Sequence, residues 1–533
     1  MITDTLDTAL RTALVAIGVT PPDSVHLERP ARREHGDWSS NVALATAKAA
    51  GRNPREMAAA LVAELSAASI PHVDVVEIAG PGFVNFRLHD TWLHDVLRAV
   101  VDAGTERFGR HDVGAGVKVN VEFVSANPTG PLHAGHARGA CYGDTVARLL
   151  EAVGHSVERE FYINDRGVQM QTYAASLAAR KAGQEPPEDG YQGRYIIDWA
   201  AEMPDDADPL EWGYAYAKAY QQETLASLGI VFDTWFSERS MIASGAIDEA
   251  LADLRAHGVV YENDGATWLR STDYGDDKDR VLVRSDGDYT YITPDIAYHR
   301  DKFRRADRLV NIWGADHHGY IARMKAAMQA LGHDPDELRI EITQMVRLMR
   351  EGEEVKLSKR TGDIIELREI VDEIGADATR FTYLTQSVET PQTFDLVLAA
   401  SKNMDNPVFY VQMAHARLRS IQAKAAEAGV VAAPLAEVDL TPLSHERELE
   451  VLRSLDQFPE LVSIAARELA PHKIISWLRD HASAVHGFYH DCYVMGDGVS
   501  PELTQARLWL CEAARVGLAA GLDLVGVSAP DSM

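Results

Sequence analysis

The segment 117–163 constrains the fold more than any other part of the chain. Apolar and β-branched residues alternate through Val117–Val124, which predicts a β-strand. A loop rich in proline and glycine follows at Asn127–Leu132, a helix is expected over Gly135–Val153, and a second strand fits Val157–Ile163. A strand, a tight loop, a helix and a strand form the βαβ unit of a doubly wound sheet, so the segment predicts an α/β domain with parallel strands.

The same type of domain extends well beyond this unit. Strands are expected at Leu309–Trp313 and Leu338–Ile342, with a helix at Tyr320–Leu331 between them. The segment at about 165–288 is less regular and is interpreted as an insertion. We therefore expect one Rossmann-like domain over residues 111–374, interrupted by that insertion.

The two ends of the chain predict different architectures. Residues 1–110 combine amphipathic helices with two short strands around a Gly-Pro-Gly turn, which predicts a small N-terminal α+β domain. In residues 375–533, apolar residues recur at helical spacing, which predicts a C-terminal all-α helix bundle.

The composition limits the kinds of protein that the chain can be. Its 533 residues are too many for one core and fit about two to four domains. No apolar run approaches the roughly 20 residues that a membrane-spanning helix needs, and MITDTLDTAL lacks the regions of a signal peptide. The cysteines Cys141, Cys492 and Cys511 form no CxxC pair, so we expect a cytoplasmic protein without a cysteine metal site.

The net charge of −28 argues against a non-specific nucleic-acid binder, because affinity for phosphates comes mainly from lysine and arginine. Net charge governs solubility and steering, however, whereas binding depends on local patches. A nucleic-acid partner that is recognised through a local basic surface is still compatible with the sequence.

The tetrapeptide HAGH, His133–His136, lies where the first strand meets the helix. Ligands of open α/β sheets bind beyond the carboxyl ends of the strands, and a helix N-terminus offers unpaired N–H groups that suit phosphate. The histidines can donate to phosphate oxygens, and Gly135 has no Cβ, so an adenine ring can lie against the backbone. Taken alone, the tetrapeptide could be two solvated or core histidines, but the preceding NPTGP segment, 127–131, favours nucleotide binding.

A second candidate motif is KLSKR, Lys356–Arg360. Ammonium groups on a loop can neutralise the charge that develops on pyrophosphate in a transition state. A short basic run by itself is usually a solvated surface. Paired with an upstream HxGH at a strand–helix junction, it indicates nucleotide chemistry.

Together, HAGH and KLSKR resemble the HIGH and KMSKS signatures of class I aminoacyl-tRNA synthetases. The string VEFVSANPTGPLHAGHARGACYGD resembles the arginyl-tRNA synthetase family in particular. Further similar strings extend the resemblance over essentially the whole chain: EHGDWSSNVAL (Glu34–Leu44), REFYINDRGVQM (Arg159–Met170), YITPDIAYHRDKF (Tyr291–Phe303), NIWGADHHGY (Asn311–Tyr320), DATR (Asp377–Arg380) and YVQMAHARLRSI (Tyr410–Ile421). The chain departs from the signatures at Ala134, a packing position, and at Leu357 and Arg360, but Lys359 is retained.

The resemblance implies a reaction in two steps. The arginine carboxylate attacks the α-phosphorus of ATP, which gives arginyl-adenylate and pyrophosphate, and arginine then passes to the terminal ribose of tRNA. The family uses Mg²⁺ and needs bound tRNA even for the first step. The implied catalytic residues are His133, His136, Lys356 and Lys359, and the implied ATP contacts are Pro131, Leu132, His133, Gly135, His136, Ser358 and Lys359. No metal site made of protein residues is expected.

Acidic residues favour arginine as the amino acid, because a guanidinium cannot be deprotonated and prefers bidentate carboxylates. Glu122 lies on the strand before HAGH, and Tyr291 precedes Asp295 by four residues, which is the spacing of one helix face. Taken alone, Glu122 could be a surface residue and Asp295 a helix N-cap. By resemblance, both carboxylates hold the guanidinium, and Tyr291 packs on it or bonds to it.

The resemblance also implies the rest of the amino-acid pocket. Asn127 and Ser125 would hold the α-ammonium or carboxylate group, and Asp316 and His317 would complete the pocket. A site that satisfies a polar substrate group rejects an analogue lacking it by about 10⁴ to 10⁵. We therefore expect no editing activity.

The helix bundle is expected to read the anticodon, because unpaired loop bases are accessible to stacking and edge contacts. The N-terminal domain is expected to contact the corner of the tRNA, and by resemblance the protein is a monomer. For each single residue, ordinary packing or solvation is the open alternative. The candidate tRNA contacts are Arg29, Arg32 and Arg33 in the N-terminal domain and Tyr410, Gln412, His415, Arg417 and Arg419 in the bundle.

Other functions share part of this pattern. A cytidylyltransferase-like nucleotidylyltransferase also uses HxGH but does not need a long helix bundle. A non-catalytic tRNA-binding paralogue typically loses HxGH or the second lysine, and this chain keeps both. Another class I synthetase is the third alternative.

Overall fold

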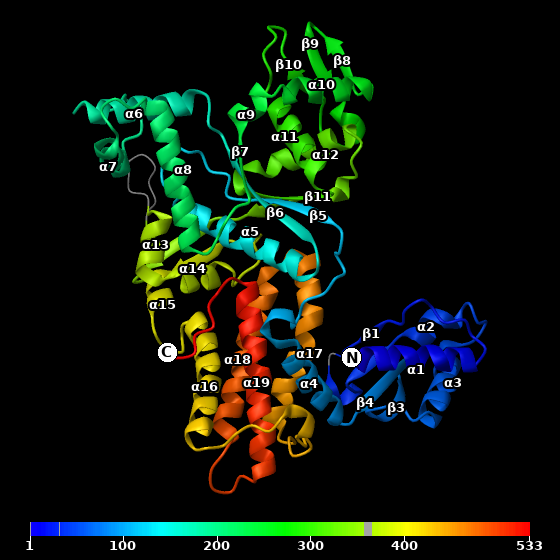
Figure 1. Cartoon of the computed structure of the whole chain (residues 1–533). Helices are drawn as coiled ribbons and strands as arrows, with labels where there is room; N and C mark the ends of the chain where they lie inside the picture. The colour runs from blue at the N-terminus through cyan, green and yellow to red at the C-terminus, as the bar shows by residue number, and fades with distance from the viewer. Residues whose placement is uncertain (1, 31, 356–364) are drawn as a thin grey trace. The chain divides into compact units, whose positions relative to one another are not determined.

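The computed structural model describes residues 2–30, 32–355 and 365–533, and Figure 1 shows their helices and strands. The chain divides into two compact units. The first unit consists of Met1–Phe108, Arg417–Gln457 and Ser483–Gly517, and the second consists of Gly109–Ala416, Phe458–Ala482 and Leu518–Met533. The junction after Phe108 lies beside the predicted boundary at residue 110, whereas the segment predicted as one helical domain contributes to both units.

The second unit is built on a five-stranded parallel sheet in the order β12-β11-β5-β6-β7. Its strands are β5 (Lys118–Glu122), β6 (Ser156–Ile163), β7 (Thr234–Ser237), β11 (Arg308–Gly314) and β12 (Leu338–Thr343). The strand order reverses between β5 and β11, because β6 and β7 extend the sheet on one side and β12 extends it on the other. The predicted doubly wound α/β architecture is confirmed, and β5 and β11 mark its switch point.

Helix α5 (Ala134–Ala152) follows β5 and packs closely on the sheet. The close packing depends on Gly143, because a Cβ there would lie 2.3 Å from the ring of Phe123. Phe123 comes directly after β5 and is itself fully buried. Helix and strand are therefore held together at the point where the HAGH segment begins.

The segment predicted as one insertion is divided by a strand of the sheet. β7 pairs in parallel with β6, so the chain leaves the sheet before β7 and again after it. This corrects the single insertion predicted at 165–288, because the four residues of β7 are half-buried and too few to show the alternation that marks a longer strand. The first excursion contains α6 (Val168–Lys181), α7 (Arg194–Glu202) and α8 (Pro209–Ser227). The second contains α9 (Glu238–Ala243), α10 (Ala246–Ala256), β8 (Val260–Asn263), β9 (Ala266–Leu269) and β10 (Arg280–Val283).

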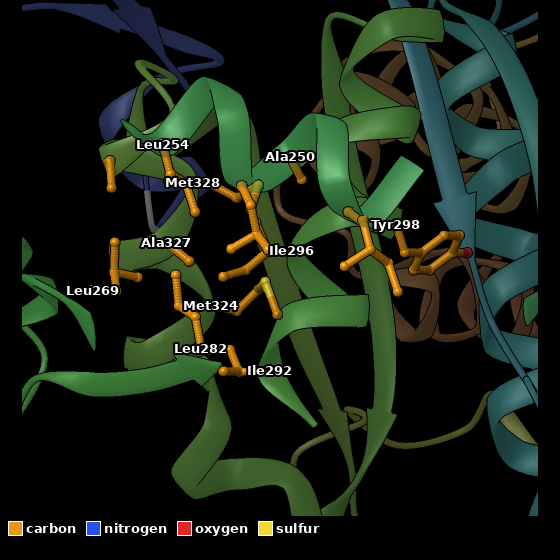
Figure 2. Close-up of a cluster of buried hydrophobic side chains, with 14 of the residues drawn as sticks. Ala250, Leu254, Leu269, Leu282, Ile292, Ile296, Tyr298, Met324, Ala327 and Met328 are labelled. Carbon is orange, nitrogen blue, oxygen red and sulfur yellow. The ribbon is translucent and has the colours of Figure 1, made fainter. Parts of the chain in front are cut away.

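A buried cluster joins the second excursion to the helices that follow it, α11 (Ile292–Arg305) and α12 (Ile321–Ala330) (Figure 2). Ile292 and Ile296 of α11 pack with Met324 and Met328 of α12 in this cluster. The spacing of four residues in each pair puts one apolar face of each helix into the core. Burial of this face fixes the rotation of α11, and with it the direction of its polar residues.

The rest of the second unit follows the five-stranded sheet. A smaller sheet has the order β14-β13-β15. These elements are β13 (Val346–Arg350), β14 (Glu353–Glu354), α13 (Leu367–Ile374), α14 (Ala376–Tyr383), β15 (Gln392–Asp395) and α15 (Leu396–Ala400).

The N-terminal part of the first unit has the predicted α+β architecture. Its antiparallel sheet has the order β1-β2-β4-β3, and the predicted Gly-Pro-Gly turn joins β3 to β4. Its elements are α1 (Ile2–Ala16), β1 (Leu27–Glu28), β2 (Trp38–Ser40), α2 (Val42–Ala47), α3 (Pro54–Ala67), β3 (Val73–Ala79), β4 (Phe83–Leu88) and α4 (Thr91–Arg107).

Four long helices form most of the C-terminal segment, as the helical spacing of its apolar residues predicts. They are α16 (Pro407–Glu427), α17 (Glu446–Arg467), α18 (Pro471–Asp491) and α19 (Pro501–Leu524). Among the described residues, no helix combines the length and apolar character that crossing a bilayer requires.

Arg380 connects distant segments within the second unit. Its side chain is fully buried and donates to Asp144 Oδ2 of α5 at 2.6 Å. It also donates to the carbonyl oxygens of Leu228, at the end of α8, and Val525, in the C-terminal segment, each at 3.0 Å. Gly526 accommodates it, because a Cβ there would lie 2.3 Å from the guanidinium. One buried charge thus fixes α5 relative to three other segments.

Replacement of Arg380 by methionine is expected to lower the free energy of unfolding by about 3–5 kcal/mol, because it removes one partner of a buried ion pair and leaves carbonyl groups unsatisfied. Denaturant unfolding, followed by circular dichroism, measures this loss. Arg148→Met is the matched control: Arg148 donates to the same carboxylate at 2.8 Å, but its side chain is 29% exposed. Its loss is expected to cost about 1 kcal/mol or less, and equal losses would contradict the role of Arg380.

Candidate active site

The predicted residues that follow β5 and β11 lie at the switch point of the sheet. β5 ends at Glu122, and its neighbour β11 ends at Gly314. The loop 123–133 continues from β5 to the start of α5, and the 3₁₀ helix Ala315–Tyr320 continues from β11. Because the two strands are parallel, both continuations begin on the same side of the sheet, at the carboxyl ends of the strands.

The two histidines of HAGH form the N-terminal cap of α5. The Nδ1 atom of His133 accepts a hydrogen bond from the backbone N–H of Gly135 at 3.0 Å, and Nδ1 of His136 accepts one from the N–H of His133 at 3.2 Å. Their ring centroids are 3.9 Å apart. With Nδ1 as the acceptor, each neutral ring carries its proton on Nε2. Two imidazole N–H groups and a helix N-terminus are therefore combined in one place, which suits an anion.

Gly135 is required next to His133. It is exposed, and a Cβ there would come within 2.8 Å of the His133 ring. Any other residue would displace the ring or the start of the helix. The predicted close approach of a ligand to this backbone is compatible with the exposed glycine. Of the other predicted ATP contacts, Pro131 is half-buried and Leu132 is buried.

The segment after KLSKR returns to HAGH. The N–H of Ala134 donates to the carbonyl of Ile365 at 3.1 Å, and the N–H of Leu367 donates to that of Leu132 at 2.8 Å. His133 and Glu366 form an antiparallel bridge between these bonds. The predicted residues Lys356, Ser358 and Lys359 lie outside the described residues. Residues 365–367, with which the described chain resumes, are held beside the first motif.

Helix α8 holds both of these segments. The side chain of Gln221 is buried and donates to the carbonyl oxygens of Asn127 at 3.0 Å and Gly130 at 2.9 Å. Its neighbour Tyr220 donates to the Glu366 carboxylate at 2.8 Å. The α6–α8 excursion therefore supports the loop before HAGH and the segment after KLSKR at once. The exposed Asn127 side chain donates to Gln169.

Glu122 is buried at the end of β5 and both of its oxygens have partners. Oε2 accepts from the ammonium of Lys302 at 2.7 Å, and Oε1 accepts from the hydroxyl of Ser125 at 3.0 Å. Ser125 and Val124 have φ values of 44° and 68°, which costs about 1–3 kcal/mol for each residue. Burial raises the pKa of Glu122, but the charges of Lys302 and His299 and the two hydrogen bonds lower it, and the net shift is downward.

Asp295 has a different electrostatic environment. It lies in the first turn of α11 and accepts from the hydroxyl of Tyr320 at 2.6 Å, but it forms no salt bridge with a described lysine or arginine. Burial, together with the nearby charges of Glu122 and Glu238, raises its pKa to about 7 against the opposing effects of the Tyr320 hydrogen bond and the Arg323 charge. The pocket therefore contains a carboxylate that has no direct salt bridge with a described lysine or arginine.

Three residues of this pocket were not predicted from the sequence: Lys302, Tyr320 and Glu238. Glu238 begins α9, directly after β7, and hydrogen-bonds Tyr162 of β6. Lys302 follows Asp295 by seven residues, which is two helical turns. This spacing is a signal that could have found Lys302. No comparable signal marks Glu238 or Tyr320, because their positions depend on tertiary structure.

The remaining predicted pocket residues are exposed. Tyr291 is the N-cap of α11, and its side chain is 88% exposed. The expectation that Tyr291 packs on the guanidinium or bonds to it concerns the bound substrate and stays a prediction. Asp316 and His317 are exposed on the 3₁₀ helix after β11.

The predicted tRNA contacts differ in accessibility. In the first unit, Arg29 packs on the Trp38 ring at 4.3 Å and pairs with Asp456, whereas Arg32 and Arg33 have exposed side chains. Arg417, half-buried, lies 5.0 Å from the ring of Tyr489 and contacts His486.

Two of the residues predicted on α16 are buried in the second unit. Gln412 donates to Asp377 and to the carbonyl of Ser528, and His415 contacts the carbonyl of Pro530 at 2.9 Å. This corrects the prediction that they contact tRNA, because their side chains hold the C-terminal segment instead. Tyr410 and Arg419 are half-buried.

Three family models match the chain in succession. They describe an arginyl tRNA synthetase N-terminal domain at residues 3–88, a class I (R) tRNA synthetase catalytic domain at 104–190 and 215–392, and a DALR anticodon binding domain at 411–533. The gap in the catalytic match, 191–214, lies within the first excursion from the sheet.

Individual relatives agree with these matches. An arginine–tRNA ligase of Bacillus cereus is 46% identical over 530 residues, covering 96% of this chain and 94% of the relative. One of Geobacillus thermodenitrificans is 45% identical over 544 residues, covering 98% and 96%. The structure of Thermus thermophilus arginyl-tRNA synthetase has a TM-score of 0.74, with 23% identity and complete coverage of both chains, and supports the fold.

The doubly wound sheet with HAGH at the switch point places the protein among the class I aminoacyl-tRNA synthetases. With the relatives above, the chain belongs to the arginyl-tRNA synthetase family. The predicted family is thus confirmed.

Proposed function

We propose that this protein attaches L-arginine to tRNA at the expense of ATP. In the first step, the arginine carboxylate attacks the α-phosphorus, the bond to the β-phosphate breaks, and pyrophosphate leaves. In the second step, a ribose hydroxyl of tRNA attacks the carbonyl carbon of the adenylate, and AMP leaves. The observation that carries the proposal is the half-buried Asp295 carboxylate, which forms no salt bridge with a described lysine or arginine and lies within electrostatic reach of Glu122 at the end of β5.

ATP is proposed to bind across the start of α5. The imidazole N–H groups of His133 and His136 would face its phosphates, and Gly135 would leave room for the adenine. Lys356, Ser358 and Lys359 would add contacts and positive charge when pyrophosphate forms. Mg²⁺ is proposed to enter bound to the phosphates, as it does at many ATP sites, and to neutralise their charge. Within the described residues, no cluster of three or more His, Cys, Asp or Glu side chains could hold a metal ion.

The arginine guanidinium is proposed to bind between Glu122 and Asp295, with Glu238 nearby. A planar guanidinium carries five donors and can bind carboxylates bidentately, whereas a lysine ammonium cannot match that geometry. This selection supports the absence of an editing reaction. Asn127 and Ser125 are proposed to hold the α-ammonium or carboxylate group, and Tyr291, Asp316 and His317 to close over the substrate from their exposed positions.

For tRNA, the proposal is confined to accessible side chains. Tyr410, Arg417 and Arg419 of α16 are the proposed anticodon contacts, and Arg32 and Arg33, with Arg29 behind them, are proposed to contact the tRNA corner. Tyr489 adds a partly exposed ring beside Arg417, on which a base can stack. We further propose that the protein is a monomer, that it is cytoplasmic, and that it needs bound tRNA for the first step.

His136→Ala and Lys359→Ala are each expected to slow arginine activation by about 10²–10³-fold, because each removes a donor that stabilises phosphate charge in the transition state. Pyrophosphate exchange with arginine and saturating tRNA measures the rate. Lys402→Ala, at an exposed lysine after α15, is the matched control and is expected to keep the wild-type rate. Unchanged rates in both variants would exclude the two residues from the mechanism.

Arginine binding is expected to strengthen as the pH rises through 7, because protonated Asp295 cannot form a charge-assisted bond with the guanidinium. With its pKa at about 7, the KM for arginine should be about tenfold higher at pH 6 than at pH 8. The KM is measured by aminoacylation at saturating ATP and tRNA.

Asp295→Asn should raise this KM and remove most of its pH dependence. Asp286→Asn, at an exposed carboxylate outside the proposed pocket, should keep the dependence. A wild-type KM that does not change with pH would refute the role of Asp295.

A further inference from the structure

Lys302 is fully buried beneath the candidate arginine pocket. From α11 it reaches two neighbouring strands: its ammonium donates to Glu122 Oε2 at the end of β5 at 2.7 Å and to Asn311 Oδ1 in β11 at 2.6 Å. The ammonium also lies 4.8 Å from the ring centroid of Tyr298. Lysine is almost never fully buried unless it is paired. The ammonium thus has two hydrogen-bond acceptors and one aromatic ring around it.

Stability alone does not explain this ion pair. Replacement of a buried ion pair by packed apolar residues is often neutral or stabilising, because both charges must be desolvated. Apolar packing was available, since the neighbouring helix α12 and the rest of α11 contribute to a large hydrophobic cluster. The pair lies instead at the switch point, in contact with a residue of the proposed pocket.

The Glu122 carboxylate is held in one orientation. Lys302 binds one oxygen, and the Ser125 hydroxyl binds the other at 3.0 Å. Asn311 is fixed in turn, because its Nδ2 lies 2.7 Å from Nε2 of the buried His299. Each carboxylate oxygen has a second acceptor position, so Glu122 can still accept bonds from a guanidinium. A carboxylate held in this way needs little reorganisation when the substrate binds to it.

We propose that Lys302 is a positioning residue for arginine recognition, which keeps the Glu122 carboxylate ionised and fixed so that it can bind the guanidinium together with Asp295. The inference rests on the proposed role of Glu122 in arginine binding. Lys302 itself does not touch the substrate and acts through Glu122.

The charges around the pair make Lys302 necessary. Burial alone would raise the pKa of Glu122, and Lys302 is the first of the groups that lower it. The other titratable and charged groups around Glu122 and Lys302 are Tyr298, His299 and Asp295 of α11, Glu160 and Tyr162 of β6, Glu238 of α9, Tyr320 of the 3₁₀ helix after β11 and Arg323 of α12. His299 has its pKa lowered to about 4 by burial, so it is neutral at pH 7 and cannot replace the ammonium.

Removal of the ammonium has a predictable effect on pH dependence. In Lys302→Met, the pKa of Glu122 rises because burial is no longer opposed by the adjacent cation. A protonated Glu122 must lose its proton before it binds a guanidinium. The KM for arginine therefore increases, and it falls more steeply with rising pH than in the wild type, where Glu122 is already ionised and the pKa of Asp295 is about 7.

The test compares Lys302→Met, Lys302→Arg, Glu122→Gln and the double variant Glu122→Gln/Lys302→Met. The KM for arginine, the KM for ATP and kcat are measured by aminoacylation between about pH 6 and pH 8.5. Lys302→Met is expected to raise the arginine KM at pH 7 about tenfold or more, while the ATP KM changes less than about twofold. Lys302→Arg, which keeps the charge, should restore the arginine KM to within about threefold of the wild type.

The double variant separates positioning from a structural role. If Lys302 acts through Glu122, Lys302→Met adds less than about twofold to the arginine KM of Glu122→Gln. The inference would be overturned if Lys302→Met raised the arginine KM of the Glu122→Gln variant as much as it raises that of the wild type. An unchanged arginine KM and pH profile in the single variant Lys302→Met would also overturn it. If Lys302→Met does not fold, the double variant is still informative, because it removes both charges of the Glu122–Lys302 pair. Its arginine KM is then compared with that of Glu122→Gln alone.

The proposed function and this inference fail in different ways. An unchanged arginine KM in Glu122→Gln would refute the arginine-binding role of Glu122 and with it the role of Lys302. An increase in Glu122→Gln without an increase in Lys302→Met would refute only the inference about Lys302. Absence of arginine activation by the wild-type protein in the presence of tRNA would refute the proposed function itself.

Discussion

The balance of charge between the end of β5 and the start of α11 is the constraint on which the site depends. Glu122 is neutralised by a buried ammonium, whereas the half-buried Asp295 forms no salt bridge with a described lysine or arginine and has its pKa raised to about 7. A pocket with this imbalance is least stable when it is empty and ionised, because desolvated charge is costly unless it is paired. A substrate cation that enters it supplies the missing charge, and a guanidinium supplies it with a geometry that fits carboxylates.

The fold brings this pocket to the nucleotide motif. The strand that ends at Glu122 continues within eleven residues into His133, the cap of α5, and Gly143 keeps that helix close to the sheet. Helix α8 then supports the connecting loop through Gln221. The amino-acid carboxylate and the α-phosphate can therefore meet without a covalent enzyme intermediate, which makes positioning and charge stabilisation the main contributions of the protein.

Much of this arrangement could be predicted from the sequence. The βαβ unit, the flanking architectures and the position of HAGH follow from local periodicity and turn residues, which act over short distances. The role of β7 was missed, because a strand of four half-buried residues is too short to show a clear alternation. Lys302 could have been suspected from its helical spacing to Asp295, but its contact with Glu122 depends on the tertiary structure, as does the position of Glu238 near Asp295. Gln412 shows the reverse error, because a polar residue on a helix was interpreted as a contact surface but is buried.

The central claim is that this site activates arginine. It is tested most directly by pyrophosphate exchange with each of the standard amino acids, with and without arginine-accepting tRNA. The account predicts exchange with arginine when tRNA is present and much weaker exchange with lysine, whose ammonium cannot bridge the carboxylates. Absence of exchange with arginine and tRNA, or equal exchange with lysine, would contradict it.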